Sequence, residues 1–162
     1  MASVNYFLKL DGITGDAADA KHKGFIDLES WSWGETQSGG QAGGGGGGAG
    51  KVAMQDLHVT ARTSIASPKL MLACASGKHL KEARLVGVRA GRGQAEFLTV
   101  TLSDVLVSSY QAGGAEAGGD APFDQVSLNF AKIVFEVRAQ KADGSLDAPV
   151  RAGWHVKQNK PV

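Results

Sequence analysis

Most of the chain alternates between apolar and polar residues, the pattern of a β-strand with one face against a core. In residues 4–10, every second side chain is apolar. Later segments read as strands in the same way, namely 25–34, 52–62, 82–90, 95–110, 125–141 and 150–157. Turns at Gly91-Arg92-Gly93 and Asp143-Gly144 separate the last four of these. The pattern therefore predicts a mainly β protein.

Two of the expected strands change the parity of their apolar residues partway. The long strand near residue 130 has even-numbered apolar residues up to Phe130 and odd-numbered ones from Ile133 onward. The strand near residue 30 switches between Leu28 and Trp31. A strand changes its buried face only where a residue is inserted or where it passes into another sheet. Long bent strands of this kind form the corners of a small closed barrel, so we expect a β-barrel of two sheets.

One segment carries helical signals instead. Residues 67–76 contain good helix formers, with Ser67 as the expected N-cap, Pro68 in the first turn and Gly77 after the end. Cys74 falls on the apolar side of this helix. We interpret it as a small core residue rather than a reactive thiol.

Length and charge narrow the classes of protein. With 162 residues, the chain suits a single domain, 1–162, on the usual range of roughly 100–200 residues. The 17 Lys and Arg residues nearly balance 16 Asp and Glu residues, which gives no electrostatic reason to bind nucleic acid. No apolar stretch is long enough to insert into a membrane, and the N-terminus lacks the features of a signal peptide.

Glycine is over-represented, with 23 residues, and we expect flexible glycine-rich loops near 38–50 and 112–121. The first tract ends in Gly45 to Lys51, a near-match to a phosphate-binding loop. That loop needs Ser or Thr after the lysine and then a helix, whereas Val52 and an expected strand follow here. A flexible loop is the better interpretation.

No constellation of residues points to catalysis, a cofactor or a metal. The four histidines lack the i, i+4 spacing of a helical zinc site, and the single cysteine has no second thiol beside it. There is also no Gly-x-Ser-x-Gly nucleophile motif. We therefore expect a protein that is not an enzyme.

Trp31 and Trp33 lie one residue apart and so point the same way from a strand, while Ser30 and Ser32 point the other way. We expect the tryptophans to fill the barrel interior, which leaves the serines on the outer surface. Stacking of the tryptophans on a sugar is the alternative.

Distinctive stretches follow one another along essentially the whole chain: Tyr6–Ile13, Ile26–Gly34, Lys51-Val52, Gln55–Leu57, Ser67–Met71, Ser76–His79, Asp104–Tyr110, Val126–Ala131, Gln140–Gly144 and Ala152–Trp154. In this order they resemble the haemolysin-coregulated protein (Hcp) family of the type VI secretion system. His155 and Ser64 depart from the residues we expect there, and neither affects the architecture.

The resemblance implies a barrel with one helix, six copies of which form a ring. Rings stack into a tube inside a sheath and beneath a spike, and the tube is expelled with small effector proteins carried in its lumen. The partners are then further copies of the chain, the sheath and spike proteins, and the effectors. The protein is made in the cytoplasm and secreted without a signal peptide. In such a ring the alternation makes Ser32 the candidate lumen contact, and the alternative is that Ser32 faces a neighbouring subunit or solvent. A chain ending soon after its last strand suits a plain tube protein.

Two other classes remain open at this stage. A monomeric ligand- or carbohydrate-binding β-domain would use exposed tryptophans, Trp31, Trp33 or Trp154. A small hydrolase would assemble a site from residues such as His58 and Asp104.

Overall fold

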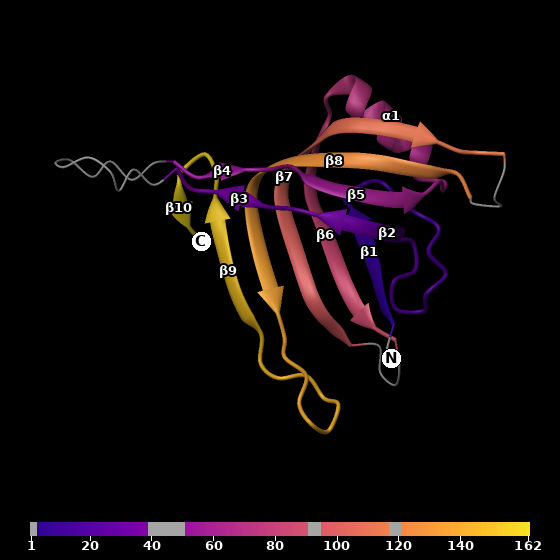
Figure 1. Cartoon of the computed structure of the whole chain (residues 1–162). Helices are drawn as coiled ribbons and strands as arrows, with labels where there is room; N and C mark the ends of the chain where they lie inside the picture. The colour runs from indigo at the N-terminus through magenta and orange to yellow at the C-terminus, as the bar shows by residue number, and fades with distance from the viewer. Residues whose placement is uncertain (1–2, 39–50, 91–94, 117–120) are drawn as a thin grey trace.

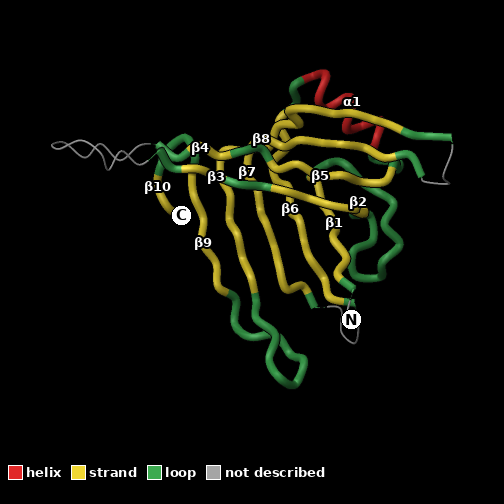
Figure 2. The backbone as a smooth tube through the Cα atoms, viewed as in Figure 1, coloured by secondary structure: helices red, strands yellow, loops and turns green. Residues whose placement is uncertain are grey.

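The computed structural model describes residues 3–38, 51–90, 95–116 and 121–162. Its elements are β1 (Val4–Leu10), β2 (Ile26–Ser32), β3 (Glu35–Thr36), β4 (Ala53–Met54), β5 (Leu57–Arg62), α1 (Ser67–Ser76), β6 (His79–Arg89), β7 (Glu96–Gly113), β8 (Phe123–Val137), β9 (Val150–His155) and β10 (Lys160–Pro161). The mainly β fold with one helix, expected from the alternation, is confirmed for these residues (Figure 2).

The strands close into a six-stranded barrel. The order β8, β5, β2, β1, β6, β7 returns to its start because β7 also pairs with β8, while β9 and β10 extend the sheet beyond β8. The short strands β3 and β4 form a separate ribbon. In Figure 1, strands β2 and β5 run at a steep angle to strands β6 and β9. The barrel therefore consists of two sheets, as expected.

The corners of the barrel are the predicted parity switches. Strand β8 pairs with β5 over residues 123–128 and with β9 over 132–137, and so belongs to both sheets. At the level between these ranges, Asp104 of β7 has a left-handed backbone with φ of 53°, which turns the apolar face of β7 as well. In β2, a register shift between Leu28 and Ser30 makes the same change.

One apolar core fills the barrel, and its deepest side chains come from both sheets. Leu57, Leu85, Leu102 and Leu128 are all fully buried. Cys74 is partly buried and packs against this core, in agreement with its expected role. A second, smaller cluster around Phe7 lies beneath the loop that leads into β2.

Several boundaries differ from those expected. The segment 52–62 is wrong as a single strand, because β4 and β5 lie in different sheets. The chain breaks between them where the Gln55 backbone N–H donates to the Gly34 carbonyl over 2.9 Å. Strand β6 starts earlier than expected, at His79, and β8 ends earlier, at Val137. Strand β7 runs on to Gly113, past the expected start of the second glycine-rich loop, and residues 117–120 of that loop lie outside the described residues.

The helix starts differently from the prediction. Ala66 is the N-cap, and Ser67 is the buried first residue of α1. The Ser67 hydroxyl is used elsewhere, because its Oγ accepts the Ser64 N–H over 2.9 Å and donates to Asp124. Gly77 ends the helix in the left-handed conformation, with φ of 65°, as expected. The first glycine-rich tract, 39–50, lies outside the described residues.

Candidate functional site

The solvent-facing side of β2, β5, β8 and β7 carries two rows of uncharged polar side chains. The register aligns one row and then the other across the four strands: Ser32, His58, Ser127 and Ser109, followed by Ser30, Thr60, Gln125 and Gln111. All eight are exposed or half-exposed. None is a lysine, arginine or acid. We call this surface the polar band.

A shallow hollow of about 240 Å³ lies within the polar band, with Val59 and Val126 as its apolar lining. Nδ1 of His58 lies 2.7 Å from Oγ of Ser127 and fixes the imidazole across β5 and β8. Gln111 also lines the hollow.

Charged groups flank the polar band at its two ends. At one end, Asp56 accepts hydrogen bonds from Ser108 Oγ over 2.6 Å and from Asn129 Nδ2 over 2.9 Å. At the other, Arg62 Nε lies 3.5 Å from Glu29 Oε1. Each of these charges is therefore engaged beside the band rather than within it.

The tryptophans of β2 and its extension turn toward the interior, as expected. Trp31 and Trp33 are half-buried and pack against the core, and Trp31 meets the Tyr6 ring edge-on at 6.0 Å. Ser30 and Ser32 are exposed on the opposite face. Trp31 is thus engaged in packing rather than presented for stacking on a sugar.

An apolar groove of about 740 Å³ runs between the β3–β4 ribbon and strands β8 and β9. Trp33, Met54, Phe135 and Trp154 line it. The indole N–H groups of Trp33 and Trp154 are buried and have no hydrogen-bond partner among the described residues.

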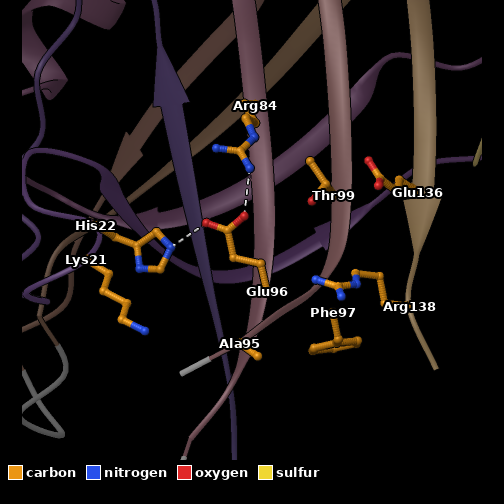
Figure 3. Close-up of a pocket in the computed structure, with 9 residues that line it drawn as sticks. All are labelled: Lys21, His22, Arg84, Ala95, Glu96, Phe97, Thr99, Glu136 and Arg138. Atoms are coloured by element: carbon orange, nitrogen blue, oxygen red, sulfur yellow. Dashed lines mark hydrogen bonds and ion pairs between the residues drawn. The ribbon is translucent and has the colours of Figure 1, made fainter. Parts of the chain in front are cut away.

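A polar pocket of about 400 Å³ lies on the outer face of β6, β7 and β8 (Figure 3). His22 is only 1% exposed, and its two ring nitrogens face carboxylates. Nδ1 lies 2.7 Å from Asp19 Oδ2, and Nε2 lies 2.9 Å from Glu96 Oε1. Arg84 Nη2 donates to the other oxygen of Glu96 over 2.6 Å. The His22 ring also stacks on Phe7, with centroids 4.7 Å apart.

We call the contacts among Asp19, His22, Glu96 and Arg84 the brace. It joins the loop before β2 to the start of β7, and the hydrogen bond from His22 holds the pKa of Asp19 below its ordinary value. The His22 ring is enclosed by Phe7, on which it stacks, and by Phe25, which it meets edge-on. Sequence reasoning missed it because His22 and Glu96 are 74 residues apart.

The residues suggested for a hydrolase are not brought together. His58 contacts Ser127, whereas Asp104 contacts His79 Nδ1 at 2.8 Å and Lys157 Nζ at 3.9 Å. Within the described ranges, no three His, Cys, Asp or Glu side chains gather in a way that suits a metal ion. None of the helical residues described forms a segment long and apolar enough to span a membrane.

Comparisons with known proteins agree with this architecture. Residues 7–137 match the family described as "Type VI secretion system effector, Hcp". The chain is 45% identical to protein hcp1 of Pseudomonas aeruginosa, over 97% of this chain and 98% of that protein. The crystal structure of Hcp1 from Salmonella typhimurium is 34% identical, with a TM-score of 0.82 over the full length of both chains.

A second solved structure, described as that of a type six secretion system protein, has a TM-score of 0.92 at 28% identity. It is covered over its whole length and covers 99% of this chain. The family match, the sequence identity and the barrel geometry all indicate the same family. The chain belongs to the Hcp family of type VI secretion proteins.

Proposed function

We propose that this chain is the subunit of a type VI secretion tube. Hcp proteins are secreted structural proteins of that system rather than members of a known enzyme family. On this proposal, copies close into a ring of six, rings stack into a tube, and the tube is expelled with small effector proteins in its lumen. The number six is what the family resemblance implies.

The observation that carries the proposal is a sheet with two open edges. Strand β7 pairs with β6 only as far as Leu106, and β2 pairs with β1 only as far as Leu28. Beyond these points, no strand in the described ranges covers the outer side of residues 107–113 or 29–32. The sheet β2–β5–β8–β7 is therefore unpaired along residues 29–32 on one side and along residues 107–113 on the other.

Open edges in soluble proteins are usually guarded by lysine, proline or covering segments, because they otherwise pair with another chain. Residues 29–32 and 107–113 contain neither lysine nor proline. Successive strands of the sheet are antiparallel, so β2 and β7 run in opposite directions. The β7 edge of one copy therefore suits antiparallel pairing with the β2 edge of the next. Such a head-to-tail contact, repeated, forms a ring when the rotation between successive copies closes on itself.

The polar band lies on the outward face of this same sheet. A ring formed edge to edge places that face of every copy on one continuous surface, and we assign it to the lumen. Ser32 then contacts the lumen, and its short side chain leaves room for a carried protein. Synthesis in the cytoplasm, export with the tube rather than by a signal peptide, and contacts with sheath and spike proteins belong to the same proposal.

Cysteine cross-linking tests the ring. In a Cys74→Ser background, two double variants are made: Ser30→Cys with Ser109→Cys, and Ser30→Cys with Gln111→Cys. Each places one cysteine on the β2 edge and one on the β7 edge, and the two differ in the position along β7. We expect a non-reducing gel ladder that ends at six chains. Ser30→Cys combined with Ser145→Cys, on the β8–β9 hairpin, is the matched control and should not form the ladder.

Light scattering of the unmodified protein completes the test. A mass of six chains is expected. A monomer at micromolar concentration, with no ladder from either cysteine pair, would overturn the proposal. It would favour the alternative, a monomeric ligand- or carbohydrate-binding domain, for which the apolar groove beside Trp33 and Trp154 is the supporting observation.

A further inference from the structure

We propose that the polar band holds a carried protein through uncharged hydrogen bonds, with the hollow at His58 and Ser127 as its centre. The inference rests on the proposed function, because it takes the band to be the lumen wall. It adds the chemistry of the partner. The band fits a protein surface rich in hydroxyl and amide side chains, and it does not select by charge.

The eight side chains of the band offer hydroxyl, amide and imidazole groups. Hydroxyl and amide groups both donate and accept hydrogen bonds, so they match neutral polar surfaces in many orientations. A lysine- or glutamate-rich surface would lose water on this wall without gaining an opposite charge. The aligned rows thus favour neutral partners over charged ones of either sign.

The centre of the band is better defined than its margins. The contact of 2.7 Å between His58 Nδ1 and Ser127 Oγ occupies one ring nitrogen. Nε2 of the exposed His58 is then the ring atom left to meet a partner. Gln111 and Gln125 line the same hollow, which places two amides beside an oriented imidazole.

The nearest charged groups lie at the two ends of the band and have partners of their own. Asp56 is held by Ser108 and Asn129, and Arg62 lies beside Glu29. Arg62 and Glu29 carry opposite charges and offset each other's field, whereas Asp56 keeps its charge at the margin, outside the two rows of the band. Single exposed hydrogen bonds are weak, but a ring repeats each contact in every copy, and linked weak contacts add to retention.

Labelled peptides test this chemistry directly. Three peptides of equal length carry the same neutral dye; one is rich in Asn, Gln and Ser, one in Glu and one in Lys. Fluorescence anisotropy measures their binding to the assembled ring. We expect the neutral peptide to bind tightest, with an affinity that changes less than about twofold between about 0.05 and about 0.5 M salt, because neutral contacts are not screened.

Substitutions in the band locate the contact. His58→Ala and Ser127→Ala should each weaken binding of the neutral peptide by about three- to tenfold, the range of one lost hydrogen bond. Gln158→Ala, an exposed amide in the turn after β9, is the matched control and should leave binding unchanged. Gln125→Lys should shift the preference to the glutamate-rich peptide and make binding salt-sensitive, whereas Gln158→Lys should not.

Two results would overturn the inference: a neutral peptide that binds no tighter than both charged ones, or band variants that bind it as the unmodified ring does. Light scattering on the same samples separates the two proposals. A protein that forms no ring fails the proposed function. An intact ring without neutral preference fails only the chemistry assigned to the band.

Discussion

Tyr110 donates its phenolic hydroxyl to Oδ1 of Asp124 over 3.0 Å, between strands β7 and β8. Asp124 is 1% exposed, and it accepts two more hydroxyl hydrogen bonds, from Thr63 Oγ1 over 3.2 Å and from Ser67 Oγ. A buried carboxylate is tolerated where donors satisfy its oxygens. This network therefore attaches the start of α1 to the sheet that carries the polar band.

Removal of the Asp124 carboxylate should destabilise the fold. Asp124→Ala leaves three hydroxyls without their acceptor, and we expect the free energy of unfolding to fall by about 3 kcal/mol. Asp124→Asn keeps one acceptor oxygen and should lose less. Urea unfolding measures both. Glu116→Ala, an exposed carboxylate, serves as the control; an equal loss in that variant would contradict the assignment.

The same network should delay the ionisation of Tyr110. Burial, followed by the hydrogen bond to Asp124, raises the pKa of Tyr110 above its ordinary value of about 10. The protonated phenol is favoured in the folded state, so this contribution to stability is complete below that value and is lost as the pH rises through the folded pKa. Tyrosinate absorbance should show one late-ionising tyrosine, absent from Tyr110→Phe. Equal titration of the variant and the unmodified protein would be a contrary result.

At the other end of the pH range, the brace around His22 should add acid sensitivity. The hydrogen bond from His22 lowers the pKa of Asp19. Its stabilisation is therefore present above the ordinary value of about 3.9 and is lost as the pH falls through the lower folded value. Urea midpoints of the unmodified protein and Asp19→Asn should differ at neutral pH and converge below about pH 3. Asp11→Asn, an exposed neighbour, should follow the unmodified curve.

Local pattern was sufficient to predict the barrel corners. The buried apolar residues of β8 change from even to odd numbers between Phe130 and Ile133, because this strand belongs to both sheets. Such a change is visible in the sequence one residue at a time. The start of α1 was harder to predict from the sequence. Ser67 has the chemistry of an N-cap, but its hydroxyl is recruited by Asp124, 57 residues away, and only the tertiary structure sets that competition.

The candidate site required long-range information. Ser32 was proposed as a candidate because it lies between Trp31 and Trp33 in the sequence, at the end of β2. The other members of the polar band lie on other strands, and only their register aligns His58 with Ser127. No spacing within a single segment records that alignment, and the same reason hid the contact between His22 and Glu96.

Gly15 should not tolerate a side chain. A Cβ at this position would lie 2.5 Å from the Phe25 carbonyl oxygen and 2.8 Å from Cγ1 of Ile26. Gly15→Ala must therefore displace backbone, and we expect a loss of about 1–3 kcal/mol in the free energy of unfolding. At Gly34, the nearest atom is the flexible Gln55 Oε1 at 3.5 Å, so Gly34→Ala should stay within about 0.5 kcal/mol. Equal urea midpoints for the two variants would contradict this difference.

Chemical labelling of position 32 distinguishes lumen from surface. In a Cys74→Ser background, Ser32→Cys in an assembled ring should react with a small maleimide but not with a maleimide-coated particle wider than the ring opening. Ser145→Cys, on the exposed β8–β9 hairpin, should react with both. Reaction of Ser32→Cys with the particle would place the residue on the outside of the ring. Reaction with neither reagent would show that the side chain at position 32 is buried in the contact between copies. Only the size-selective result supports a lumen contact for Ser32.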